Sequence, residues 1–319
     1  MYKDRTVGVV IPAYNEEALI ARSLASIPEF VDRVVVVDDG CLDATADVVR
    51  QAAAADPRIR LVRHAENRGV GAAVASGYAW CRSQGLDVAV VMGGDAQMDP
   101  ADLPALLDPV VERRADYAKG NRLVSGEAWQ KMPHVRYLGN TVLTFMTKIA
   151  SGYWHVTDSQ SGYTAIGRSA LYLLPLAEIY PRYGMPNDLL VTLNIYGMRV
   201  VDVPVKPIYG IGERSGIRIG RILFSLSFLM MRLFVKRMVH KYVIRDFHPL
   251  VLFYAFGSGL LLVDLALIVR LFVVWSARGS IPPINALAIV FCTLMSFQSI
   301  LFAMLFDMEA NRDLNGGKR

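Results

Sequence analysis

Four short polar clusters near the start of the chain hold carboxylates, amides and glycines that could bind a ligand. They read PAYNEE from Pro12, DDGCLDAT from Asp38, ENRGVG from Glu66 and GGDAQMDP from Gly93. One such cluster alone is typical of an ordinary turn. Each of the four follows a short apolar segment that predicts a buried strand, so all four are expected at one edge of a sheet. The sequence therefore predicts a binding site built from four loops.

The segments around these clusters alternate between short apolar strands and helical stretches. Strands are expected at RTVGVVIPA, DRVVVVDDG, IRLVRH and DVAVVMGG, and helices at NEEALIARSLASI, DATADVVRQAAAA and GVGAAVASGYAWCRSQ. The first of these helices is expected to carry acids in its first turn. Continuous Val and Ile runs that alternate with helices indicate a parallel sheet covered on both faces.

In this order, the motifs VIPAYNEE, VVDDGCLDAT, NRGVGAAVASGY and GDAQMDP resemble those of glycosyltransferase family 2. The resemblance covers about the first 210 residues. It implies an α/β fold of the GT-A type, with a Rossmann-like, mostly parallel sheet and helices on both faces. With the two long apolar segments near the end of the chain, it extends to the polyprenyl-phosphate glycosyltransferases, which include dolichyl-phosphate mannose synthases and undecaprenyl-phosphate glycosyltransferases. That branch implies an inverting enzyme that transfers a sugar from a UDP- or GDP-sugar to polyprenyl phosphate at the cytoplasmic leaflet.

The resemblance assigns much of the first loops to the nucleotide-sugar donor. Asp39 takes the position of the family's base- or ribose-contacting aspartate, and Asp38 either shares this task or supports the turn by capping. The glycines between Asn67 and Gly71 permit close backbone approach to donor groups. Asp188, with Asn187, matches a later acidic motif or N-caps the helix DLLVTLNIYG. The predicted donor set is Pro12, Ala13, Tyr14, Glu16, Asp39, Asn67, Gly71, Asp95, Lys119, Arg122 and Asp188.

The metal motif departs from the family pattern. Where the family has Asp-x-Asp-x-Gln, this chain has glycine at position 93, followed by Asp95 and Gln97. Mg²⁺ or Mn²⁺ would neutralise charge on a diphosphate leaving group through hard oxygen ligands. The resemblance implies such a cation on Asp95 and Gln97, with Gly93 weakening the site. Asp99 either helps or caps the helix that begins at Pro100.

Basic residues and one aspartate are assigned to the acceptor. The predicted acceptor-phosphate set is Arg136, Arg214, Ser215 and Arg218. Asp158, in TDSQSGY, takes the position of the family's catalytic base, and Asp95 is the second predicted catalytic residue. A phosphate monoester is largely dianionic near neutral pH and can attack without losing a proton. Asp158 is therefore expected either to act as a base or to orient the acceptor or a cation.

The apolar residues concentrate in two segments, at about 249–275 and 282–306, each long enough to cross a bilayer as a helix. Cations flank both ends and almost none occur in the turn, which predicts a hairpin with cytoplasmic ends. Asp264 and Arg270 are expected to pack against the other helix or another subunit. The predicted parts are a cytoplasmic GT-A domain (1–213), interfacial amphipathic helices (214–246), a transmembrane hairpin (247–308) and a cytoplasmic tail (309–319).

Composition excludes several other classes. A net charge of +5 over 319 residues does not indicate nucleic-acid binding, and 53% hydrophobic residues exclude disorder. The three cysteines lack a metal-ligand spacing and predict no disulfides. No P-loop motif and no complete GxGxxG follow the first strand, which excludes ATPase and dinucleotide sites. No N-terminal signal peptide is expected. The two apolar segments and their flanking cations predict a multi-pass protein of the inner (cytoplasmic) membrane, with the catalytic domain and both termini in the cytoplasm.

Two alternatives stay open. One is transfer to another membrane glycolipid or polysaccharide, although the Gln-x-x-Arg-Trp motif of processive synthases is absent from the sequence. The other is a nucleotide-sugar-binding subunit that has lost catalysis along with the first aspartate. A homo-oligomer, such as a tetramer, is expected by similarity alone. The identities of the nucleotide and the sugar stay open.

Overall fold

The computed structural model describes residues 1–124, 134–206, 208 and 219–317, without the side chains of 134–137 and 219–224. These residues form two compact units, Met1–Val235 with Asp313–Arg319, and Lys236–Arg312. The end of the chain belongs to the first unit because Asn315 pairs with Val200. The boundaries predicted for the catalytic, interfacial and spanning parts stay predictions.

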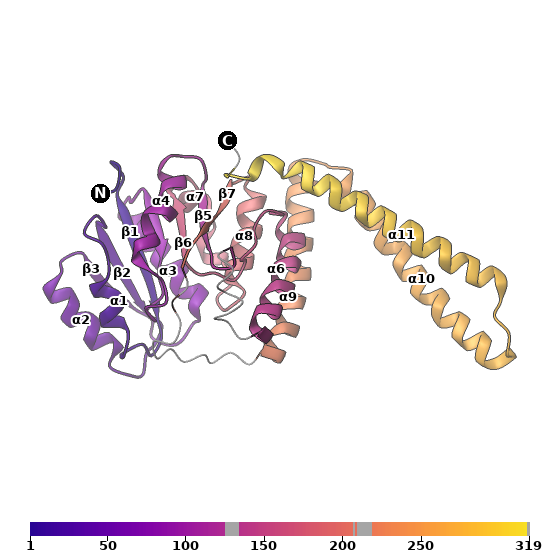
Figure 1. Cartoon of the computed structure of the whole chain (residues 1–319), viewed down its shortest axis with the longest axis horizontal. Helices are drawn as coiled ribbons and strands as arrows, with labels where there is room; N and C mark the ends of the chain where they lie inside the picture. Colours follow the sequence, from indigo (N-terminus) through magenta and orange to yellow (C-terminus); the bar gives the residue numbers. More distant parts are fainter. Residues whose placement is uncertain (125–133, 207, 209–218, 318–319) are drawn as a thin grey trace. The chain divides into compact units, whose positions relative to one another are not determined.

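Within the described residues, the first unit is built on one sheet (Figure 1). Its strands, in the spatial order β3-β2-β1-β4-β6-β5-β7, are β1 (Val7–Ala13), β2 (Arg33–Asp38), β3 (Ile59–Arg63), β4 (Val88–Val91), β5 (Tyr117–Asn121), β6 (Thr164–Gly167) and β7 (Val200–Pro204). β1 to β4 pair in parallel, as do β5 and β7, and β6 runs antiparallel to both neighbours. The predicted, mostly parallel sheet is confirmed.

Helices cover both faces of this sheet. One face carries α1 (Ile20–Ala25), α2 (Thr45–Ala55) and α4 (Leu103–Val111), and the other carries α3 (Val70–Ser83), α7 (Arg168–Leu173) and α8 (Met185–Ile195). Alternate residues of β1 enter different cores, with Val9 and Ile11 on the α1 side and Val10 on the α3 side. All three are fully buried, so the valine runs form strands because both faces are covered. Short 3₁₀ turns lie at Pro100–Asp102, Leu176–Glu178 and Arg312–Leu314.

Two helix starts differ from the sequence prediction. α1 begins at Ile20, so Glu16 and Glu17 precede it and its first turn holds no acid. The backbone N–H of Glu16 donates instead to Thr45 Oγ1 (2.8 Å), which holds this segment against the next loop. α8 begins at Met185 after Gly184, so the predicted N-cap at Asn187-Asp188 is also wrong.

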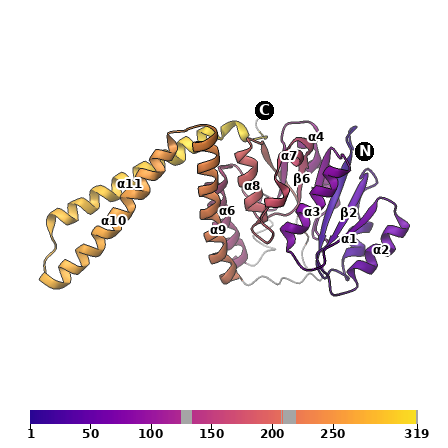
Figure 2. The same ribbon diagram turned by 180° about the vertical axis from the view of Figure 1, so that it is seen from behind.

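A third core joins α6 (His134–Ser151), α8 and α9 (Ile219–Val239). α6 and α9 lie side by side in both views (Figures 1 and 2). Leu143 of α6 and Leu229 of α9 are buried in this core. Each helix also exposes large apolar side chains at helical spacing, namely Leu138, Val142 and Phe145 on α6, and Phe228, Met231 and Val235 on α9.

The second unit contains α10 (Leu250–Arg278) and α11 (Pro283–Ala310), which pair as a hairpin (Figure 1). Both are long and apolar enough to cross a membrane, judged by length and composition. Thr293 Oγ1 donates to Asp264 Oδ2 (2.8 Å), and Ser296 Oγ donates to the Gly257 carbonyl (2.8 Å). Asp264 therefore packs against the other helix, as predicted.

A buried ionic cluster joins the end of α9 to the end of α11. Arg237 and Asp307 are fully buried and form a bidentate pair, Nη1–Oδ1 2.6 Å and Nη2–Oδ2 2.9 Å. The Tyr242 hydroxyl, in the π-helical segment His240–Arg245, donates to Asp307 Oδ1 (2.9 Å). The Asn311 side-chain amide also donates to Asp307 Oδ1 (3.0 Å). These contacts fix the start of the second unit to its last helix.

Candidate active site

The loops after β1 and β2 are joined by hydrogen bonds. The Glu16 N–H reaches Thr45 Oγ1, and the Leu42 N–H donates to Asn15 Oδ1 (2.9 Å). The two strands are parallel, so their carboxyl ends meet at one edge, as predicted. The predicted donor residues Pro12, Ala13 and Tyr14 lie there, with Tyr14 exposed and Ala13 buried.

The two aspartates after β2 both bind the chain itself. Asp38 accepts the Cys41 N–H (2.7 Å), which confirms its turn-supporting role. Asp39 is buried; its Oδ2 accepts the Gly69 N–H (2.7 Å), and its Oδ1 lies 2.7 Å from His64 Nδ1. Asp39 thus holds the third loop to the second, and its contact with base or ribose stays a prediction.

The third loop packs against another part of the chain. A Cβ on Gly71 would lie 2.1 Å from the Tyr180 carbonyl oxygen, and Gly69 has a φ of +98°. Asp188 Oδ2 accepts the Tyr180 N–H (2.8 Å) and so supports the segment that Gly71 contacts. Asn67 is exposed. The close approach at Gly71 is therefore to the chain's own backbone, and the donor contacts of Asn67, Gly71 and Asp188 stay predictions.

The loop after β4 brings Asp95 and Gln97 together. Asp95 Oδ1 accepts the Gln97 N–H (3.1 Å), and a Cβ on Gly93 would lie 2.5 Å from the same oxygen. The Asp95 carboxylate therefore fills the space of the missing side chain. Asp99 accepts the Ala101 N–H (2.9 Å), which confirms its capping role.

A second carboxylate faces this loop. The Glu16 Cγ lies 3.5 Å from the position of a Cβ on Gly94. Burial, together with the negative charges of Asp95 and Asp43, raises the pKa of Glu16 to about 7. A divalent cation bound here would relieve this repulsion. Asp95 and Gln97 therefore offer oxygen ligands to a divalent cation, whose remaining ligands would come from a diphosphate and water. Within the described residues, no group of three or more His, Cys, Asp or Glu side chains is placed to hold a metal ion.

Asp158 is held by Arg122. Arg122 Nε lies 2.8 Å from Asp158 Oδ2 and Nη2 lies 3.0 Å from Oδ1, while the Arg122 N–H donates to Oδ2 (3.1 Å). Burial raises the pKa of Asp158, but the charge and hydrogen bonds of Arg122 outweigh it and bring the pKa below its usual value. Lys119 is fully buried and donates to the Ser161 carbonyl. Burial lowers the pKa of Lys119 to about 8.

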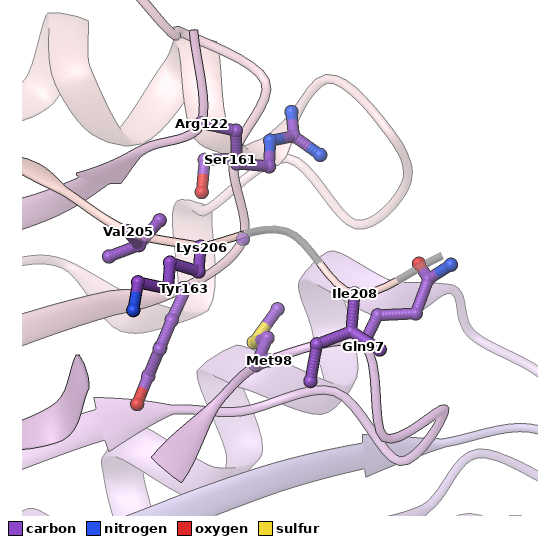
Figure 3. A pocket seen from close by; sticks show the side chains of 9 residues that line it. Gln97, Met98, Arg122, Ser161, Tyr163, Val205, Lys206 and Ile208 are labelled. Carbon is purple, nitrogen blue, oxygen red and sulfur yellow. The ribbon is translucent and has the colours of Figure 1, made fainter. Parts of the chain in front are cut away.

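One pocket collects residues from four segments (Figure 3). Arg122 stands on one side of it and Gln97 on the other. The loop after β4 and the arginine that binds Asp158 therefore line the same pocket. The sequence does not single out Met98, Tyr163 or Lys206. Lys206 lies two residues after the end of β7, and no sequence signal marks it. The lining residues are Gln97, Met98, Arg122, Ser161, Gly162, Tyr163, Val205, Lys206 and Ile208.

The structure does not describe the side chains of the predicted acceptor residues. Arg214, Ser215 and Arg218 are not among the described residues. Arg136 falls in the first turn of α6, and its side chain is not described. The Gln97 amide lines one side of the pocket, in the loop that also holds the Asp95 carboxylate, and Arg122 lines the other side. Such groups suit a cation-bound diphosphate and a further phosphate group.

Comparisons with known proteins agree with this chemistry. A family model described as glycosyl transferase family 2 matches residues 8–174. A UDP-N-acetylglucosamine–dolichyl-phosphate N-acetylglucosaminyltransferase of Methanococcus voltae is 29% identical over 72% of this chain and 97% of its own length. An undecaprenyl-phosphate mannosyltransferase of Micrococcus luteus is 32% identical over 69% of this chain and 92% of its own.

A solved structure shares the fold. It is glucosyl-3-phosphoglycerate synthase from Mycobacterium tuberculosis, in complex with Mn²⁺, UDP and glucosyl-3-phosphoglycerate. It matches with a TM-score of 0.52 and 22% identity, over 73% of this chain and 80% of the other. The likeness identifies the first unit as a GT-A fold.

Proposed function

The chain belongs to glycosyl transferase family 2, and we propose that it transfers a sugar from a nucleotide diphosphate sugar to polyprenyl phosphate at a membrane surface. The chain is a glycosyltransferase, and its named relatives act on dolichyl or undecaprenyl phosphate. The donor is a UDP- or GDP-sugar, and the catalytic unit and both termini lie on the cytoplasmic side.

One observation carries the proposal. Gln97 of the loop after β4 and Arg122 of the loop after β5 line the same pocket (Figure 3). A leaving diphosphate needs oxygen ligands and a cation, and an attacking phosphate needs a fixed positive group. Gln97, with Asp95 in the same loop, would meet the first requirement and Arg122 the second.

The proposed reaction is a single displacement. An oxygen of the acceptor phosphate forms a bond to the anomeric carbon while the bond from that carbon to the donor diphosphate breaks, so the configuration inverts. The electron pair leaves with the nucleoside diphosphate. Because the acceptor phosphate is largely dianionic near pH 7, no protein base has to remove a proton. The main task of the protein is therefore to hold the two phosphate groups in line.

Asp95 and Gln97 would hold Mg²⁺ or Mn²⁺. When bound, this cation neutralises the charge that develops on the departing diphosphate. Glycine at position 93 leaves the protein one carboxylate fewer than the family pattern, so we expect affinity for the cation to depend strongly on the donor.

Membrane attachment supports a lipid acceptor. Both hairpin helices are long and apolar enough to cross a bilayer. In the first unit, Phe145 of α6 and Phe228 of α9 are 55% and 74% exposed. Aromatic side chains at this exposure suit the headgroup layer of a bilayer. Such a protein would meet an acceptor whose hydrocarbon tail stays in the lipid.

A substrate panel tests the proposal. The full chain in lipid nanodiscs is offered UDP- and GDP-sugars with undecaprenyl phosphate and Mn²⁺, and the lipid product is identified by mass spectrometry. We expect one donor to yield a glycosyl phospholipid, and Asp95→Ala to lose it while still folding. If no donor yields this product but a glycolipid or polysaccharide acceptor does, the proposed acceptor is wrong.

A further inference from the structure

We propose that Asp158 is a positioning residue, which holds the Arg122 guanidinium as the phosphate-binding group of the pocket, and that it is not the proton acceptor of the reaction. This inference rests on the proposed function, since it assigns a task within the same site. The sequence leaves open whether Asp158 acts as a base or orients the acceptor or a cation, and this inference excludes the base role.

The geometry of the pair carries the inference. Both Asp158 oxygens are engaged by Arg122, through Nε, Nη2 and the backbone N–H. Of the two side chains, Asp158 is 1% exposed and Arg122 is 19% exposed. Arg122 lines the pocket (Figure 3). Asp158 is not among the lining residues. A ligand in the pocket can therefore contact Arg122, whereas the Asp158 carboxylate is buried and occupied by Arg122.

The chemistry agrees with this placement. A bidentate carboxylate fixes the plane of a guanidinium, and a fixed guanidinium is suited to bind phosphate oxygens. A carboxylate whose lone pairs are occupied by an arginine is a weak proton acceptor. The phosphate bound by Arg122 belongs either to the donor or to the acceptor lipid, and both present the same oxygens.

Kinetics of Asp158→Asn in the full chain test the inference. We expect KM to rise about tenfold or more, as loss of a charged hydrogen bond would give. A rise confined to one substrate identifies whose phosphate Arg122 binds. The ratio of the wild-type kcat to the Asp158→Asn kcat should stay constant between about pH 5.5 and pH 8, the range in which the acceptor phosphate loses its second proton. If Asp158 were the base, this ratio would grow as the pH falls, because the monoanionic acceptor phosphate must lose a proton before it attacks. That result would overturn the inference.

A double-mutant cycle makes the test independent of one variant. Arg122→Gln and the double variant with Asp158→Asn should show similar losses, because both remove the same phosphate contact. Fully additive losses would count against the inference. Arg122→Lys keeps the charge and provides the measurement if Asp158→Asn does not fold; we expect it to raise the same KM.

A matched control is available on the surface. Arg58 engages both Asp56 oxygens, through Nε to Oδ1 (3.1 Å) and Nη2 to Oδ2 (2.7 Å), and Asp56 is no part of the pocket, so Asp56→Asn should leave both KM values unchanged. The two hypotheses fail differently. If wild-type protein transfers no sugar to polyprenyl phosphate, both the proposed function and this inference are wrong. If the wild type is active but Asp158→Asn shows the pH-dependent loss, only the inference is wrong.

Discussion

At the residue scale, position 93 determines how much of the cation's coordination the protein supplies. The Asp95 carboxylate occupies the space beside Gly93 and is fixed there by the Gln97 N–H. A second carboxylate at position 93 would have to displace it, and a carboxylate at the end of a flexible side chain can rotate at little cost. One substitution at position 93 could therefore restore the carboxylate ligand that the family pattern has there.

We predict that Gly93→Asp tightens Mn²⁺ binding about tenfold in the presence of nucleoside diphosphate, since cation affinity rises with the number of charged oxygen ligands. Titration calorimetry or electron paramagnetic resonance of Mn²⁺ measures this without turnover. Gly93→Ala is the matched control, because it displaces the Asp95 carboxylate without adding a ligand. Equal affinities for the two variants would contradict the prediction.

Glu16 gives a pH-dependent prediction. Its pKa of about 7 in the folded chain lies above its ordinary value of 4.5, so folding favours the protonated form. The stability that Glu16 contributes is therefore present in acid and is lost as the pH rises through about 7. In the absence of donor and cation, Glu16→Gln should melt at a higher temperature than wild type at pH 8, and the difference should shrink at pH 5. A difference that is constant with pH would refute this assignment.

At the element scale, the positions of β1 to β4 could be predicted because the sheet is covered on both faces. Val34–Val37 are fully buried, and their unbroken apolar run is visible in the sequence. The carboxyl-end loops could be predicted for the same reason. The start of α1 could not, because it depends on the hydrogen bond from Glu16 to Thr45, a contact between loops that are distant in sequence.

The same limit applies to the candidate site. The motifs identify Asp95, Gln97 and Asp158, but the pairing of Asp158 with Arg122 joins residues 36 positions apart. Sequence spacing alone could not distinguish a base from a carboxylate held by an arginine. Lys206 was missed because a single lysine after a strand is ordinary in sequence, and only the fold brings it to the pocket.

Two glycines in helices should respond in opposite directions to the same substitution. Gly71→Ala places a Cβ 2.1 Å from the rigid Tyr180 carbonyl, and we expect it to lower the free energy of unfolding by about 1–3 kcal/mol. Gly139 in α6 has open space around its Cβ position, so Gly139→Ala should raise the free energy by about 0.5–1 kcal/mol. Urea unfolding of the full chain measures both. If both variants were destabilised, the close contact at Gly71 would not explain the lower free energy of unfolding of Gly71→Ala.

At the scale of the whole molecule, the second unit contains two charged side chains in its interior, where an unpaired charge would be strongly destabilising. Arg237 and Asp307 have no exposed side-chain surface, and the hydroxyl of Tyr242 is committed to the same carboxylate. A buried pair of this kind contributes little net stability compared with apolar residues, but removing one partner leaves an uncompensated charge. We therefore expect the pair to specify which turn of α11 meets the end of α9, more than to stabilise the unit.

This argument makes a prediction about single and double variants. Arg237→Met or Asp307→Leu alone should destabilise the full chain in detergent by about 3–5 kcal/mol, whereas the double variant should recover most of that loss. The exposed pair Arg312–Glu309 is the control, and its removal should cost at most about 1 kcal/mol. Thermal unfolding followed by circular dichroism measures all four. A double variant as unstable as the sum of the single variants would mean that each residue stabilises the unit through other contacts, and that the ion pair does not set the register of the hairpin.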